Sequence, residues 1–141
     1  MPRRSSPTAL ADRIVRQAIA GACVIASEPL VDAFRNSNFK LLLGRPPGAV
    51  VVRFYEHGAS LCRKELDLMR LVGGAVPVAE MLHAEPRGAP DLPPFVVLRC
   101  VEGITFRELK RVGDREAIAQ AAHAIGQTLA AIGRFTFHKP G

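Results

Sequence analysis

The most constraining feature of this sequence is an apolar run with a single cation in it, AVVVRFY at residues 49–55. Its β-branched and aromatic residues predict a buried β-strand. Arg53 falls on the same strand face as Val51 and Tyr55, because successive side chains of a strand point to opposite faces. A charge among apolar neighbours is costly unless an opposite charge pairs with it. The fold is therefore expected to bring an acid to Arg53.

A helix predicted over residues 60–72 supplies a candidate for that acid. On an idealised helix Glu65 is the one acid inside a broad apolar arc, which is made of Leu61, Cys62, Leu66, Leu68, Met69 and Val72. An acid at the edge of such an arc can also reach solvent along its stem, and this alternative stays open. The interpretation that accounts for both charges is that Glu65 points at the sheet and pairs with Arg53. A strand cation fixed by a helix acid is suited to binding phosphate oxygens.

The remaining pattern predicts an α+β layout with five short strands in an antiparallel sheet. A first helix is expected at about residues 8–20, capped by Ser6. Thr105 and Glu108 have the spacing of a capping box, which predicts a short helix from residue 105, and Asp114 is expected to cap a last helix. The strands are expected at residues 23–30, 39–43, 50–55, 78–84 and 95–101, the first three forming a meander and the helix of residues 60–72 following the third.

Length and composition favour one soluble domain. The chain has 141 residues, of which 48% are hydrophobic and 23% charged, as is ordinary for globular proteins. No apolar run reaches the roughly 18 residues of a membrane span, and no apolar signal core follows the basic N-terminus. We therefore expect no membrane association and a cytoplasmic location. Cys23, Cys62 and Cys100 lack C-x-x-C spacing and are expected to be reduced core residues.

The net charge of +6 raises the question of an acidic partner. The basic residues are spread along the chain without interleaved aromatics, so a solvated surface is a better interpretation than a nucleic-acid site. Nucleic-acid binding stays as a weaker hypothesis, which predicts retention of DNA or RNA that falls with salt. An anionic small ligand such as a nucleotide suits the same charge.

The order and spacing of these pieces resemble a known family. Strand–loop–strand, a strand with Lys or Arg, a helix with Glu, and two strands before a hinge are typical of the N-lobe of the protein-kinase-like fold. Over about residues 8–135 the chain is similar to the aminoglycoside phosphotransferase and choline-kinase-like branch. The stretches that carry this resemblance are NSNFKL (36–41), VVVRF (50–54), RKELDLM (63–69), VPVAEML (76–82), PFVVLRCVEG (94–103) and GQTLAAI (126–132).

The resemblance implies a site for ATP or GTP with Mg²⁺. Arg53 would contact the α- and β-phosphates, Glu65 would orient Arg53, and Asn38 would close the phosphate-covering loop. A hinge at residues 99–101 would meet the base through its backbone. The full set of residues at nucleotide-binding positions of the family is Asn38, Arg53, Glu65, Arg99, Cys100 and Val101.

The chain also departs from the family pattern. Residues 31–38 contain no glycine, although the phosphate loop of the family usually has one. None of the four histidines is followed by aspartate two residues on, so the catalytic His-Gly-Asp sequence and the later metal-binding Asp are absent. Acids do not pair with His or Cys at metal-ligand spacing either. We assign no catalytic or metal-binding residue and expect no catalysis from this chain by itself.

The resemblance also implies a domain organisation. We expect a basic tail at residues 1–7, a nucleotide-binding N-lobe at residues 8–103 and the start of a helical C-lobe at residues 104–141, truncated before the catalytic loop. The chain would be a fragment or a truncated gene product of a small-molecule kinase. Its full-length parent would transfer the γ-phosphoryl of ATP or GTP to a hydroxyl of a small acceptor, which would bind in the missing C-lobe.

The alternative is a non-catalytic binding or scaffold module built on a kinase N-lobe. Without a C-lobe, an apolar surface near Leu129, Ile132, Phe135 and Phe137 would be exposed, and such surfaces usually find a partner. Self-association through this surface is therefore expected. A stand-alone module predicts a monomer or a defined oligomer, whereas a severed lobe predicts aggregation.

Overall fold

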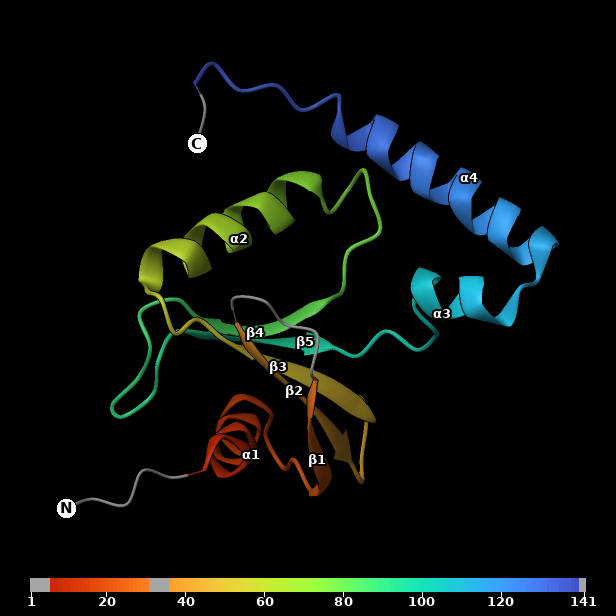
Figure 1. The fold of residues 1–141 in the computed structure, drawn as a ribbon. Helices are drawn as coiled ribbons and strands as arrows, with labels where there is room; N and C mark the ends of the chain where they lie inside the picture. Colours follow the sequence, from red (N-terminus) through yellow and green to blue (C-terminus); the bar gives the residue numbers. More distant parts are fainter. Residues whose placement is uncertain (1–5, 31–35, 140–141) are drawn as a thin grey trace. The chain divides into compact units, whose positions relative to one another are not determined.

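The computed structural model describes residues 6–30 and 36–139 and divides into two compact units (Figure 1). The described residues up to Asp67, together with Ala79–Cys100, form the first unit. Leu68–Val78 and the described residues from Val101 onward form the second. The predicted α+β class with a five-stranded antiparallel sheet is confirmed, and the sheet lies wholly in the first unit.

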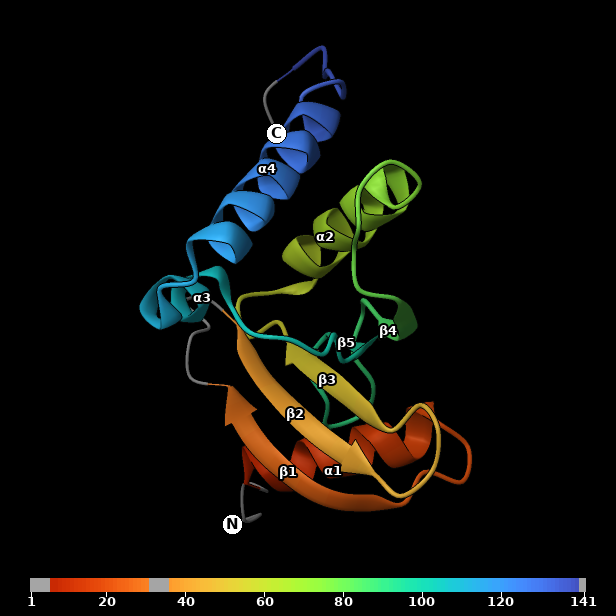
Figure 2. The ribbon, with the colours of Figure 1, turned by 90° about the vertical axis from the view of Figure 1, so that its right-hand side faces the viewer.

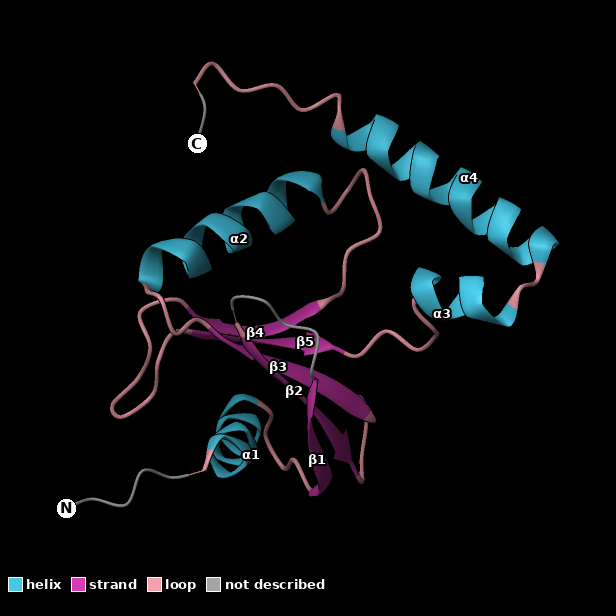
Figure 3. Cartoon of the chain, viewed as in Figure 1, coloured by secondary structure: helices cyan, strands magenta, loops and turns pink. Residues whose placement is uncertain are grey.

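The sheet has the strand order β1-β2-β3-β5-β4, and every pair of neighbouring strands is antiparallel (Figure 3). The strands are β1 (Val24–Leu30), β2 (Ser37–Leu43), β3 (Ala49–Phe54), β4 (Met81–Glu85) and β5 (Phe95–Arg99). The first three form the expected meander. β3 lies at the centre, with β2 on one side and β5 on the other.

Two of the strands are shorter than predicted, one at its start and one at its end. β4 begins at Met81 rather than at residue 78, and β5 ends at Arg99 rather than at residue 101. The apolar alternation extended both predictions to Val78 and Val101, which lie outside the observed strands and are 42% and 74% exposed. Val78 and Val101 belong to the second unit, whereas Ala79, Glu80 and Cys100 belong to the first, so the apolar pattern runs on past the ends of the strands.

One face of the sheet is covered by α1 (Pro7–Ala18), which lies along it (Figure 2). The predicted cap is confirmed, since Ser6 Oγ accepts a hydrogen bond from the Ala9 N–H at 3.2 Å. Ala11, Ile14 and Val15 of α1 are fully buried. They pack in one cluster with apolar residues that alternate along the strands, namely Phe39, Leu41, Leu43, Val50, Val52, Phe54, Phe95 and Val97. This cluster is the hydrophobic core of the first unit.

The other face of the sheet carries the polar side chains of Asn38, Lys40 and Arg53 beside apolar ones such as Leu42 and Val51. Along β3, Val51 and Arg53 are half-buried. The residues that alternate with them, Val50, Val52 and Phe54, face the core and are buried. The helix α2 (Ala59–Val72) begins in the first unit, and its residues up to Asp67 lie on this second side of the sheet. Because a strand alternates its faces, the same strands supply the core on one side and the candidate site on the other.

The second unit contains two helices beyond the end of α2. α3 (Phe106–Val112) begins with the predicted capping box, since Thr105 Oγ1 accepts the Glu108 N–H at 3.2 Å and Glu108 Oε2 accepts the Thr105 N–H at 2.7 Å. These bonds from Thr105 lower the pKa of Glu108, because they favour its carboxylate form. α3 ends at Gly113, whose φ of 79° is a left-handed conformation that suits glycine.

The last helix, α4 (Arg115–Ile132), is capped by Asp114 as predicted, through a 3.0 Å bond from the Ala117 N–H to Oδ1. Its apolar side chains are largely exposed, with Leu129 at 62%. Ile132 is 43% exposed, and Phe137 beyond the helix is 65% exposed. None of the helices in the described residues is long and apolar enough to cross a membrane.

Ile14 and Ile25 differ in burial and should therefore differ in how much they stabilise the first unit. Ile14→Ala removes a fully buried side chain between α1 and the sheet and should lower the free energy of unfolding by about 2–5 kcal/mol. The matched control is Ile25→Ala on β1, where the side chain is 63% exposed, and it should change stability by about 0.5 kcal/mol or less. Urea unfolding followed by circular dichroism measures both variants. Equal losses in the two would contradict the assigned core.

Candidate functional site

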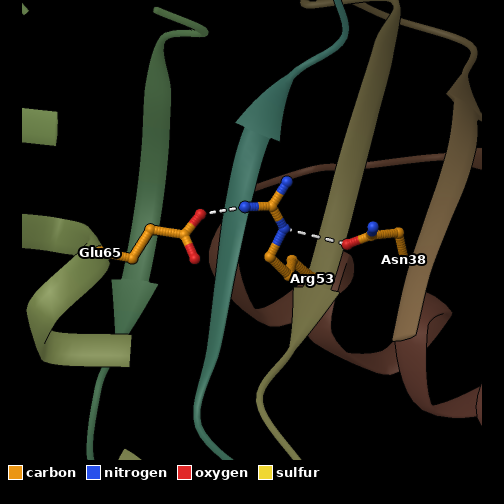
Figure 4. A network of polar contacts seen from close by, with 3 residues as sticks. All are labelled: Asn38, Arg53 and Glu65. Carbon is orange, nitrogen blue, oxygen red and sulfur yellow. Dashed lines mark hydrogen bonds and ion pairs between the residues drawn. The ribbon is translucent and has the colours of Figure 1, made fainter. Parts of the chain in front are cut away.

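Three side chains from three elements meet on the second face of the sheet (Figure 4). The Nη1 group of Arg53 on β3 donates to Oε1 of Glu65 on α2, forming an ion pair. The Nε group of Arg53 donates to Oδ1 of Asn38 on β2 at 3.0 Å. The Arg53 and Glu65 side chains are 28% and 29% exposed, so the ion pair is partly buried and partly open to water. The predicted pairing of Arg53 with Glu65 is confirmed and displaces the alternative in which Glu65 reaches into solvent.

The backbone register explains why these three side chains meet. Asn38 lies directly opposite Arg53 in the antiparallel ladder of β2 and β3, so their side chains share a face. Arg53 is also paired with Val96 of β5, which holds β3 from its other side. Glu65 is fixed from the helix, because Cys62 one turn earlier and Leu66 next to it are both buried. The site is therefore built on regular elements rather than on loops.

The Arg53 guanidinium keeps donors that these contacts do not use. A guanidinium has five N–H groups in a planar fork, and the two contacts engage one on Nε and one on Nη1. The second terminal nitrogen makes no hydrogen bond to a described residue (Figure 4). A fork oriented by a carboxylate and an amide can bind a phosphate group through two parallel hydrogen bonds. An ion pair this open to water adds at most about 1 kcal/mol of stability, so orientation is its main effect.

Tyr55 lies next to this network and is almost fully buried, with 1% of its surface exposed. Its hydroxyl makes no hydrogen bond within the described part of the chain. Burial raises the pKa of Tyr55, and the nearby Glu65 carboxylate raises it further, although the two groups do not reach hydrogen-bonding geometry. Tyr55 thus stays a neutral phenol beside Glu65 at physiological pH.

The hinge residues are held by backbone bonds that the sequence does not reveal. The Arg99 N–H donates to the Glu80 carbonyl at 2.8 Å, and the Arg99 side chain pairs with the Glu80 carboxylate at 2.5 Å. The Cys100 N–H donates to the Ala49 carbonyl at 3.1 Å, which ties the end of β5 to the start of β3. A purine bond from either N–H would compete with these bonds. Val101 belongs to the second unit, and a nucleotide-binding role for all three residues stays a prediction.

A cavity of about 320 Å³ opens on the face of β1 and β2 and is lined by Ala26, Ser27, Glu28, Lys40 and Leu42. The sequence did not predict this cavity. Lys40 was missed by the sequence reasoning. The signal was present, because Lys40 follows Asn38 by two residues in a strand and so shares its face. Most of the predicted phosphate-covering loop, residues 31–35, lies outside the described residues.

The three cysteines have different environments. Cys62 is fully buried, and its pKa is raised to about 11, first by burial and then by the carboxylates of Glu65 and Glu85. Cys23 is exposed and Cys100 is half-buried. The prediction that all three are core residues is therefore wrong for Cys23, because β1 is an edge strand and Cys23 lies just before it.

An antiparallel sheet whose central strand bears a cation held by a helix acid is the arrangement of a kinase-like N-lobe. Residues 27–139 match the phosphotransferase enzyme family (APH). This match covers most of the chain, and the chain belongs to that family, as the resemblance to aminoglycoside phosphotransferases indicated. Searches of the curated proteins and of the solved structures found no match.

The cysteine environments predict a difference in thiol reactivity. Raising the pKa of Cys62 from 9.0 to about 11 leaves about 100-fold less thiolate near neutral pH, and burial blocks access to it. A variant that keeps only Cys62 should react with Ellman's reagent slowly, and at the rate of a free thiol once unfolded in urea. The matched variant keeps only Cys23 and should react quickly without urea. Fast reaction of Cys62 in the folded protein would contradict its assigned burial.

Proposed function

We propose that this chain is the nucleotide-binding portion of a small-molecule kinase and binds ATP or GTP on the sheet face that carries Arg53. The observation behind this proposal is the guanidinium of Arg53, which Glu65 and Asn38 orient while its remaining N–H groups make no hydrogen bond to a described residue. Membership of a phosphotransferase family supports a phosphate-bearing ligand. In the intact kinase, Arg53 would donate hydrogen bonds to the α- and β-phosphates and so position them.

The surroundings of Arg53 suit the other half of a nucleotide. Ala26, Leu42 and Val51 lie on the same face of the sheet, as the register of β1, β2 and β3 requires. Leu42 is 46% exposed, so this apolar surface is available to a ligand. A purine base can stack on such side chains and remove their surface from water. The apolar residues that would contact the base and the cation that would bind the phosphates then lie at different points along the same strands.

No group of three or more His, Cys, Asp or Glu side chains in residues 6–30 and 36–139 lies close enough to hold a metal ion. Glu65 is engaged by Arg53. No residue of this chain is therefore assigned to Mg²⁺.

The sequence also lacks the catalytic base that phosphoryl transfer in this family requires. The His-Gly-Asp sequence that supplies the catalytic base in this family does not occur in the 141 residues. A bound nucleotide would therefore lack a group to activate the acceptor hydroxyl. We infer that the chain binds nucleotide without transferring phosphate, and that the acceptor is recognised by residues outside this sequence.

Isothermal titration of the 141-residue chain with non-hydrolysable ATP and GTP analogues tests the nucleotide site. Arg53→Ala should weaken binding roughly tenfold to a hundredfold, because it removes charge-assisted hydrogen bonds to phosphate. Glu65→Ala should weaken binding in the same direction by loosening Arg53. The matched control is Arg63→Ala, which removes the same charge from an exposed position on α2 and should leave binding unchanged.

Two outcomes would count against this function. Equal binding by the wild type and Arg53→Ala, with matching circular dichroism spectra, would remove Arg53 from the site. Transfer of the labelled γ-phosphoryl of ATP or GTP to a hydroxyl acceptor by the chain would show that it carries its own catalytic groups, contrary to the proposal.

The exposed residues of the second unit support a second candidate function, a non-catalytic module that associates with a second copy of the chain. Leu129 and Ile132 are 62% and 43% exposed on α4, and Phe137 is 65% exposed. Phe135, expected in the same surface, is half-buried. Large apolar side chains gathered in a short stretch of chain are typical of a surface that binds a partner.

Sedimentation velocity measures this association. A module predicts a monomer–oligomer equilibrium of defined stoichiometry, which Leu129→Asp should shift to monomer because a charge replaces an apolar contact. The control is Val112→Asp on α3, a residue that is 72% exposed and outside this surface. A broad distribution of large aggregates would favour a severed kinase lobe instead.

A further inference from the structure

Lys40 is a second cation on the sheet face of Arg53. We propose that Lys40 binds the phosphate chain of the nucleotide together with Arg53, so that two cations of the site contact the phosphates. This inference rests on the proposed nucleotide function and names a binding residue that the resemblance does not supply.

The strand register places the two cations as neighbours. Lys40 lies directly opposite Val51 in the ladder of β2 and β3, and Arg53 follows Val51 by two residues on the same face. Such diagonal neighbours are roughly 7–8 Å apart at the backbone, within reach of two long side chains. The ammonium and the guanidinium can therefore contact adjacent phosphates of one chain.

The charge balance of this face also points to Lys40. The charge of Arg53 is largely offset by Glu65, so the pair presents donors but little net charge to a ligand. Among the described residues, no acid lies within ion-pair distance of the Lys40 ammonium. A phosphate chain carries several negative charges, which the nearly neutral pair of Arg53 and Glu65 does not balance. Lys40 supplies a positive charge on this face that no contact to a described residue neutralises.

Burial shows that Lys40 is placed at a concave surface. Its side chain is half-buried and lines the cavity of about 320 Å³ on β1 and β2. Ala26 and Leu42 line the same cavity and lie farther from Arg53 along the strands. A nucleotide whose base rests on these apolar residues would direct its phosphates past Lys40 toward Arg53.

A purely structural role for Lys40 makes a different prediction. Glu28 lies directly opposite Lys40 across β1 and β2, where the two could stabilise the strand pair by their opposite charges. In that role Glu28→Gln would lower stability and leave nucleotide affinity unchanged. In the proposed role Glu28 is a carboxylate close to the phosphates, so Glu28→Gln should strengthen triphosphate binding by reducing repulsion.

The experiment compares ligands that differ only in their phosphates. The affinities of the 141-residue chain for a nucleoside and for its mono-, di- and triphosphate are measured by isothermal titration, with inorganic tripolyphosphate as a ligand without a base. Lys40→Met should weaken triphosphate binding roughly tenfold, leave nucleoside binding unchanged and reduce the gain from each added phosphate. Lys40→Arg should restore most of the affinity, and Lys64→Met, on an exposed position of α2, is the charge-matched control.

The outcomes separate this inference from the function on which it rests. If Arg53→Ala weakens triphosphate binding while Lys40→Met matches Lys64→Met, the second cation is overturned and the nucleotide site stands. If the wild type binds neither nucleotide nor tripolyphosphate, both proposals are overturned. Tripolyphosphate that binds as tightly as the nucleotide, and depends equally on Lys40, supports the two-cation site but assigns no contribution to the base.

Discussion

The contact between Arg53 and Glu65 joins the central strand to the helix that follows it, and the candidate site depends on this contact. Asn38 completes it from the neighbouring strand, so the guanidinium is held from two sides. The contact is partly open to water, and its net contribution to stability is accordingly small. Its importance lies in orientation, because an arginine that is already fixed loses less conformational freedom when an anion binds.

Much of this arrangement could be predicted from the sequence because its signals are local. The lone cation in an apolar strand and the lone acid in an apolar helix face each required a partner, and the structure pairs them. Helix caps were equally readable, since Ser6, Thr105 and Asp114 act on backbone groups only three residues away. These features depend on chemistry and spacing within short segments.

The features that were missed depend on long-range pairing. Apolar alternation could not show where β4 begins or β5 ends, because Val78 and Val101 look like strand residues but lie outside both strands. The relation of Lys40 to the site depends on the strand register, which places Lys40 diagonally across from Arg53. The bonds from Arg99 and Cys100 to Glu80 and Ala49 join residues far apart in the sequence, which a scan for local patterns does not relate.

The alternation along β3 has a consequence for how such a protein can diverge. Val50, Val52 and Phe54 face the core under α1, whereas Val51 and Arg53 face the candidate site. Stability and ligand preference are thus encoded at interleaved positions of one strand. Substitutions at every second residue could change what is bound without unpacking the domain, so ligand specificity could drift over generations while the scaffold persists.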